Sequence, residues 1–132
     1  MNDHELIEKI LTAYKTIAVV GISAKEGRPA NDVPHYMLSQ GYKIIPVNPT
    51  LEEWNGIKAY PDLKSVPEKI ELVNIFRQSE DIPPVLEDAI VAGAKAIWMH
   101  SGIINEQAAA KARAAGIEVM MDHCIRVEHR NL

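Results

Sequence analysis

The chain has 132 residues, the size of one ordinary domain, and we expect residues 1–132 to fold around a single hydrophobic core. Its net charge is -4, with acidic and basic residues mixed along the sequence, which argues against a broad basic surface for nucleic acid or an anionic membrane. A single cysteine cannot form a disulfide within the chain, and the charged N-terminal segment differs from a secretion signal. No apolar run reaches the roughly 20 residues needed to span a membrane. A cytoplasmic protein is therefore expected.

The predicted elements alternate between helix and strand along the chain. A helix over residues 3–14 comes first. Five short apolar segments follow, at residues 16–21, 43–48, 70–76, 96–100 and 118–121. Consecutive residues of these segments are apolar, with no polar alternation, which is typical of parallel strands covered by helices on both faces. The sequence therefore predicts a five-stranded parallel sheet.

Helical segments fill most of the gaps between these strands. Gly41, Gly93 and Gly116 each end a helical segment shortly before the next strand begins. The expected N-terminal caps are Asn31 or Asp32, Asp81 and Asn105, and a last helix is expected from about Asp122, with Asp122 and Arg126 forming an ion pair. Only residues 49–69 are irregular, with a short helix predicted around residues 62–66.

Alternating strands and helices with right-handed crossovers predict an α/β fold, a doubly wound three-layer sandwich with the simplest strand order 3-2-1-4-5. Such folds bind ligands at the carboxyl ends of their strands, near the point where the strand order reverses. The candidate binding segments are therefore the residues that follow each strand: 21–29, 47–50, 76–79, 100–103 and 122–129.

The loop that follows the first strand has the composition of a phosphate site. Gly21 allows a tight turn and a close approach of the backbone to a ligand, while Ser23 offers a hydroxyl and free backbone N–H groups to an anion. Lys25 and Arg28 add two positive charges. The alternative is an ordinary tight turn with two solvated surface cations.

A conventional dinucleotide site has two features against it. The G-x-G-x-x-G spacing is absent, because the glycine after Gly21 is Gly27. The second strand ends in Asn48 and Pro49, without the carboxylate that binds an adenosine ribose hydroxyl. The missing acid favours a ligand with a ribose phosphate, which leaves NADP and coenzyme A open.

Five segments carry a resemblance to a known family: "VVGIS…RPA", "YKIIPVNP", "VNIFR", "WMHSGI" and "DHCIRVEH". In this order, and at the ends of the predicted strands, they resemble the stand-alone CoA-binding domain family, which is similar to the N-terminal domain of the succinyl-CoA synthetase alpha subunit. The resemblance extends from about Thr16 to His129. The synthetase's second domain, with its phosphorylated histidine, would begin near the end of this chain, so ligase activity is not implied.

The resemblance implies a Rossmann-like domain that binds coenzyme A or an acyl-CoA, with the pyrophosphate over the loop at Gly21–Pro29. It also implies that Arg28, Pro29, Asn48 and Pro49 approach the adenosine and phosphate groups. Phe76 and Arg77 are expected to border the ligand. The expected binding residues are Gly21, Ile22, Ser23, Lys25, Arg28, Pro29, Val47, Asn48, Pro49, Phe76, Arg77, Ser101 and Gly102.

The cysteine and histidines near the C-terminus do not have the spacing of a metal module, and we expect no metal site. His123 and Cys124 are adjacent, without a C-x-x-C or H-x-x-x-H partner, and a lone cysteine usually behaves as a small buried hydrophobe. His100 and His129 are the other two histidines considered for such a site. No residue is expected to be catalytic.

Three hypotheses for function remain. The first is a CoA-binding or acyl-CoA-binding module without its own chemistry, acting as a carrier, a sensor or the partner of another protein. The second is a small enzyme that uses NADP or another nucleotide. The third is an interaction protein with a vestigial pocket.

Overall fold

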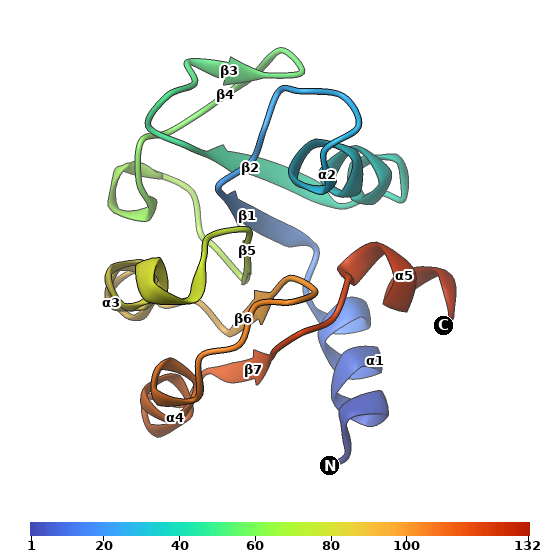
Figure 1. The fold of residues 1–132 in the computed structure, drawn as a ribbon, viewed down its shortest axis with the longest axis vertical. Helices are drawn as coiled ribbons and strands as arrows, with labels where there is room; N and C mark the ends of the chain where they lie inside the picture. Colours follow the sequence, from blue (N-terminus) through green and yellow to red (C-terminus); the bar gives the residue numbers. More distant parts are fainter.

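The computed structural model describes residues 1–132 as five parallel strands between two layers of helices (Figure 1). The sheet consists of β1 (Thr16–Val20), β2 (Lys43–Val47), β5 (Leu72–Ile75), β6 (Ala96–Met99) and β7 (Glu118–Met120). The helices are α1 (Asp3–Ala13), α2 (Pro29–Ser39), α3 (Ile82–Val91), α4 (Glu106–Ala114) and α5 (Ile125–Arg130). The short elements are the hairpin strands β3 (Glu53–Trp54) and β4 (Ile57–Lys58) and the 3-10 turns Leu63–Ser65 and Ser79–Asp81.

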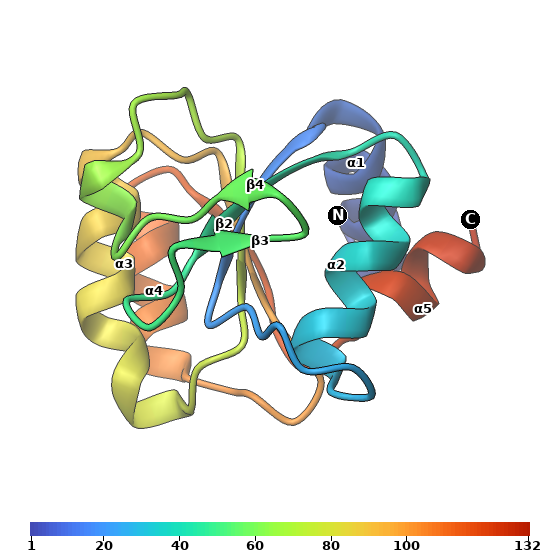
Figure 2. The same ribbon diagram turned by 90° about the horizontal axis from the view of Figure 1, so that it is seen from above.

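Helices cover both faces of the sheet, as Figure 2 shows: α3 and α4 lie on one side, and α1, α2 and α5 on the other. Successive residues of β1 alternate between the two cores, with Ala18 and Val20 facing α3 and α4, and Ile17 and Val19 facing the other layer. The cores contain 19 and 16 buried residues, so neither face of the sheet is open to water. The predicted doubly wound, three-layer α/β class is confirmed.

The order of the strands differs from the expected 3-2-1-4-5. The sheet runs β2-β1-β5-β6-β7, so β5, the third long strand, pairs with β1 instead of β2. Pro46 in β2 is the sequence signal for this arrangement. Its carbonyl accepts a hydrogen bond from the Tyr60 N–H, 3.0 Å away, on the outer side of the sheet. The Pro46 nitrogen, which has no hydrogen to donate, faces the same outer side. A proline is tolerated there in an edge strand, whereas in a central strand it would leave one inter-strand hydrogen bond unmade.

The irregular segment between β2 and β5 covers that outer edge. Val47 and Tyr60 form an isolated bridge, and the N–H of Asn48 donates to the Tyr60 carbonyl, 2.8 Å away. The hairpin of β3 and β4 packs above this bridge, and the predicted short helix is the 3-10 turn Leu63–Ser65. After this turn the chain crosses to the free edge of β1, which explains the observed strand order.

The predicted helix starts are partly correct. Asn105 caps α4 by accepting from the Ala108 N–H, 2.9 Å away, as expected. Asp81 flanks α3 but makes no side-chain capping bond. The expected cap of α2 at Asn31 or Asp32 is wrong, because that helix begins three residues earlier at Pro29. Proline tolerates the first turn, where its missing N–H has no helical partner.

The last helix begins later than predicted. Asp122 lies outside α5 in a left-handed conformation, with φ of 61°, and its carboxylate accepts from the Gly102 N–H, 2.6 Å away. Cys124 flanks the first helical residue. The expected ion pair between Asp122 and Arg126 is therefore absent, because the two residues do not share a helical turn.

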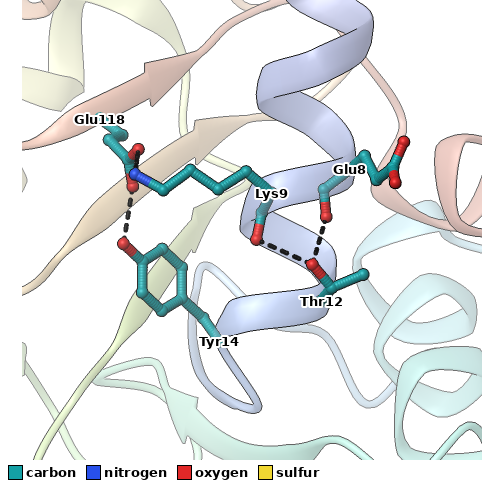
Figure 3. Close-up of polar contacts among 5 residues, drawn as sticks. All are labelled: Glu8, Lys9, Thr12, Tyr14 and Glu118. Carbon is teal, nitrogen blue, oxygen red and sulfur yellow. Dashed lines mark hydrogen bonds and ion pairs between the residues drawn. The ribbon is translucent and has the colours of Figure 1, made fainter.

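The N-terminal helix is attached to the far edge strand by a polar cluster (Figure 3). The Tyr14 hydroxyl donates to Glu118 in β7, 2.6 Å away, and Lys9 forms an ion pair with the same carboxylate. Burial, followed by the hydrogen bond to Glu118, raises the pKa of Tyr14 to about 12. This cluster joins elements separated by more than 100 residues. No helix has the length and apolar character needed to cross a bilayer, and the cytoplasmic location stays a prediction.

Candidate functional site

The loops that follow β1 and β5 meet at the point where the strand order reverses. Gly21 has φ of +86°, and a Cβ built on it would lie 3.2 Å from the Phe76 carbonyl oxygen and 3.4 Å from Cδ of Arg77. The N–H of Phe76 donates to the Val20 carbonyl, and the N–H of Gly21 donates to the Val47 carbonyl, both at 2.9 Å. Only glycine fits this position without moving a neighbouring loop.

Side chains from later segments hold the loop Gly21–Pro29 in place. The Asn48 side-chain amide donates to the Ile22 carbonyl at 2.8 Å, and its oxygen accepts from both the N–H and the hydroxyl of Thr50. The Trp54 indole N–H donates to the Ser23 carbonyl at 2.9 Å. Asn48 thus holds the loop, and its expected contact with a ligand stays a prediction. No local pattern in the sequence indicates a role for Trp54, because its partner Ser23 is 31 residues away.

The hydrogen-bond donors of this loop differ from those expected. The Ser23 N–H is not free, because it donates to the Ala30 carbonyl at 3.1 Å, while the Ser23 hydroxyl oxygen accepts from the Lys25 N–H. The backbone N–H groups of Ile22, Ala24 and Glu26 have no acceptor within the chain. Backbone N–H groups beside a helix N-terminus, here that of α2, suit an anion such as a phosphate.

The predicted cations of the loop are available to a ligand. Lys25 and Arg28 are exposed, and neither forms an ion pair within the chain. Arg28 lies directly before α2, and Pro29 is the first residue of that helix. Asp32 in its first turn accepts hydrogen bonds from the Gly27 N–H and from the Asn31 side chain, at 3.2 and 3.0 Å. The loop therefore presents two unpaired positive charges.

A hollow of about 280 Å³ lies beside this loop on the α3 side of the sheet. Of the predicted residues, Val47, Pro49 and Arg77 line it. The other lining residues are Val20, Pro61, Asp62, Leu63, Asp81, Pro84, Val85 and Asp88. Most of these come from residues 61–63 and α3, whose side chains reach the hollow only after the chain has crossed the sheet, so no local pattern in the sequence indicates them.

Asp62 changes the argument about the missing carboxylate at the end of β2. It lines the hollow next to Val47 and Pro49, where a bound ribose was expected to lie. The hydrogen bond from Ser65 lowers the pKa of Asp62, so its carboxylate is charged at neutral pH. A carboxylate is thus present near the end of β2 after all, supplied by the linker, and the charge argument for a phosphorylated ribose is weakened.

A second group of side chains lies beyond Phe76. The rings of Phe76 and His100 pack with centroids 4.5 Å apart and an angle of 33° between planes. Burial, followed by the charge of Arg126, lowers the pKa of His100, so this imidazole is neutral at pH 7. Ser101 and Gly102 follow in an exposed turn. They do not line the hollow, and their proposed contact with a ligand is separate from it.

The remaining histidines and the cysteine are not gathered into one cluster. A hydrogen bond of 2.7 Å joins Nδ1 of His129 to the Tyr36 hydroxyl, and the tautomer of His129 determines which of the two donates. His123 lies near the carboxylates of Asp3 and Glu128. Cys124 is half-buried and free. No group of three or more His, Cys, Asp or Glu side chains has a geometry that would hold a metal ion.

Comparison with known proteins points to one family. The family model described as "CoA binding domain" matches residues 15–130. The chain is 42% identical over 123 residues to an uncharacterized protein, YneT, of Bacillus subtilis, and the alignment covers 93% of this chain and 91% of YneT. A solved structure of a hypothetical protein from Pyrococcus horikoshii OT3 superposes with a TM-score of 0.95 at 41% identity, covering 99% of this chain and 92% of that one.

A more distant relative has a stated activity. The chain is 27% identical over 117 residues to the ADP-forming acetate–CoA ligase II of Archaeoglobus fulgidus. The alignment covers 86% of this chain and 17% of the ligase. The chain therefore spans less than a fifth of the length of that enzyme.

Proposed function

The chain belongs to the CoA-binding domain family, and on this premise we propose that it binds coenzyme A or an acyl-CoA at the carboxyl ends of β1, β2 and β5, without catalytic chemistry of its own. The observation that carries this proposal is the contact between the loops after β1 and β5. A Cβ at Gly21 would lie only 3.2 Å from the Phe76 carbonyl oxygen, so glycine at this position lets the two loops come together at the point where the strand order reverses. This is where α/β sheets bind their ligands.

The phosphates of the ligand are assigned to the loop Gly21–Pro29. The unpaired N–H groups of Ile22 and Ala24 and the unpaired charges of Lys25 and Arg28 favour an anion there. The pyrophosphate is the part of coenzyme A that matches this set.

The hollow beside the loop is assigned to the adenine base. Its apolar and proline-rich lining, including Val47 and Pro49, suits a flat base, whereas its three carboxylates would repel the ribose 3′-phosphate of coenzyme A, which we place outside the hollow. Asp62 is then available to accept a hydrogen bond from a hydroxyl of the ligand. Arg77 is the one cation in the lining and balances part of this negative charge.

The test is a comparison of coenzyme A, NADP and NAD as ligands of the purified protein. We expect coenzyme A to bind in calorimetry and to raise the melting temperature, since a ligand at a hundredfold excess over its Kd stabilises the folded state by about 2.7 kcal/mol. Denaturing the protein as purified and measuring the mass of any released adenine compound gives an independent readout. An equal or larger rise in melting temperature with NADP would favour the hypothesis of a small enzyme that uses NADP or another nucleotide. If none of the three compounds binds, the hypothesis of an interaction protein with a vestigial pocket remains.

A further inference from the structure

Residues 24–29, the outer part of the proposed phosphate loop, are held by hydrogen bonds more than by packing. All six residues are exposed, and a Cβ at Gly27 would meet nothing within 4 Å. Two side-chain acceptors reach this segment. The Ser23 hydroxyl accepts from the Lys25 N–H at 3.0 Å, and the Asp32 carboxylate accepts from the Gly27 N–H at 3.2 Å. The positions of the two cations in the segment therefore depend on few bonds.

Two buried side chains fix the carboxylate of Asp32 in turn. Nδ2 of Asn31 donates to the same Asp32 oxygen at 3.0 Å, and Oδ1 of Asn31 accepts from the Trp54 indole N–H at 3.2 Å. Asn31 is 4% exposed and Trp54 is 1% exposed, so neither side chain is free to exchange its partner for water. Because an indole nitrogen can only donate, Trp54 determines which way the Asn31 amide faces and directs its NH₂ group towards Asp32.

Asp32 is a charged acceptor beside a site proposed for an anion. The hydrogen bond from Asn31, followed by that from the Gly27 N–H, lowers the pKa of Asp32, so its carboxylate is charged at neutral pH. A negative charge near a phosphate opposes the binding of that phosphate. Asp32 therefore favours binding only if its hydrogen bond to the loop outweighs this repulsion. An open hollow borders this side of the segment, lined by Glu26, Gly27, Asn31, Asp32 and His35.

We propose that Trp54, Asn31 and Asp32 form a hydrogen-bonded network that positions residues 24–28 for the phosphates of the ligand, with Asp32 acting as a positioning residue through the Gly27 N–H. A loop that is ordered before the ligand arrives loses less conformational entropy on binding. Through Trp54, the hairpin of β3 and β4 then contributes to affinity without touching the ligand. The inference rests on the proposed function, because it assigns the network to the proposed phosphate site.

The test compares Asp32→Asn with Asp32→Ala, using coenzyme A as the ligand in calorimetry. Both substitutions remove the negative charge, so the effect of that charge on an anionic ligand cancels in the comparison. Only asparagine keeps an oxygen that can accept from the Gly27 N–H. We expect Asp32→Ala to bind coenzyme A about tenfold more weakly than Asp32→Asn, as the loss of one positioning hydrogen bond provides.

The other end of the network is tested with Trp54→Phe, which removes the indole N–H. We expect Trp54→Phe to weaken coenzyme A binding by about tenfold. In this background the ratio between Asp32→Ala and Asp32→Asn should fall below about threefold, because the Asn31 amide is no longer oriented. The matched control is Trp98→Phe, which loses an indole bond to the His123 carbonyl, 2.8 Å away, and should keep the affinity of the wild type.

The outcomes separate this inference from the proposed function. Equal affinities of Asp32→Asn and Asp32→Ala, with coenzyme A bound by the wild type, would overturn the network alone, since Asp32 would act through its charge or not at all. An unchanged tenfold ratio in the Trp54→Phe background would show that Asp32 acts independently of Trp54 and would also overturn it. Failure of the wild type to bind coenzyme A would overturn the proposed function and this inference with it. Circular dichroism checks the fold of each variant, and if Trp54→Phe does not fold, the Asp32 pair still decides whether that carboxylate positions the loop.

Discussion

Two glycines in the same loop have similar backbone conformations and different surroundings. Gly21 and Gly27 have φ of +86° and +88°, so alanine is strained at either position. A Cβ at Gly21 would meet the Phe76 carbonyl at 3.2 Å, whereas a Cβ at Gly27 would meet nothing within 4 Å. Substitutions at the two glycines therefore separate the free-energy cost of a left-handed backbone at a residue with a side chain from the cost of pushing two loops apart.

We predict that Gly21→Ala weakens coenzyme A binding by tenfold or more, because the added Cβ shifts the loop backbone away from the ligand. A loss of about 1.4 kcal/mol of binding free energy corresponds to a factor of ten in affinity. Gly27→Ala should stay within a few-fold of wild type. Both variants should lose about 1–2 kcal/mol of stability from the strained backbone, and Gly21→Ala should lose more. Calorimetry and urea unfolding measure the two effects. Equal effects of both substitutions on affinity would show that the contact with Phe76 does not shape the site.

Cys124 lies beside the start of α5 and is half-buried. We predict that Cys124→Ser leaves reversible coenzyme A binding within a few-fold, because the proposed phosphate and adenosine contacts do not include it. With CoA disulfide, the wild-type thiolate is expected to form a mixed disulfide and release one CoA thiolate, which the serine variant cannot do. Intact mass spectrometry and calorimetry measure the adduct and the affinity. A large loss of affinity in a folded serine variant would contradict a module without chemistry.

At the scale of elements, the attachment of α1 to β7 depends on the hydrogen bond between Tyr14 and Glu118. The pKa of Tyr14 is about 12 in the folded protein, against an ordinary value of 10.0. The hydroxyl is therefore protonated, and the bond contributes fully, below pH 10. This contribution to stability is lost as the pH rises from 10 to 12, because the unfolded chain releases the proton first.

We predict that Tyr14→Phe lowers the free energy of unfolding by about 1 kcal/mol near pH 8, the usual contribution of one hydrogen bond. The difference between the variant and wild type should shrink as the pH rises above 10. Tyr60→Phe is the control, because the Tyr60 hydroxyl makes no hydrogen bond within the chain. Denaturant unfolding at several pH values measures this. A difference that stays constant from pH 8 to 12 would show that the Tyr14 proton is not linked to folding.

At the scale of the whole molecule, the two cores share one sheet. Ala18 and Ile17 are adjacent in β1 and belong to opposite cores, so neither helix layer can leave without exposing apolar residues of the same strands. The hairpin of β3 and β4 is joined to the rest through Trp54, which donates to Ser23 and to Asn31. This arrangement favours a single cooperative unit over residues 1–132.

We predict that far-ultraviolet circular dichroism and tryptophan fluorescence report the same unfolding midpoint in urea. The two tryptophans probe different regions, since Trp54 lies in the hairpin and Trp98 in β6. In Trp98→Phe only Trp54 emits, and its transition should still coincide with that of circular dichroism. An earlier fluorescence transition in this variant would show that the linker of residues 48–71 unfolds by itself.

Particular residues show how far the sequence could predict the site. Gly21 was placed correctly at the switch point, because a glycine after a buried strand carries a local signal of its turn. Pro46 carries an equally local signal for an edge strand, and the predicted order 3-2-1-4-5 does not take this signal into account. Asp62 and Trp54 carried no such signal, because each becomes part of the site only through contacts with distant segments.

The sequence by itself determined the α/β class, the five strands, the parallel direction and the edge of the sheet where a ligand is expected. These follow from the spacing of apolar residues and from glycine and proline, which act over a few neighbouring residues. Only the tertiary structure decided the order of the strands, the acidic lining of the hollow and the packing of His100 against Phe76. The physical reason is that these contacts depend on which strand edges pair, and that choice is made by hydrogen bonds and packing between segments far apart in the chain.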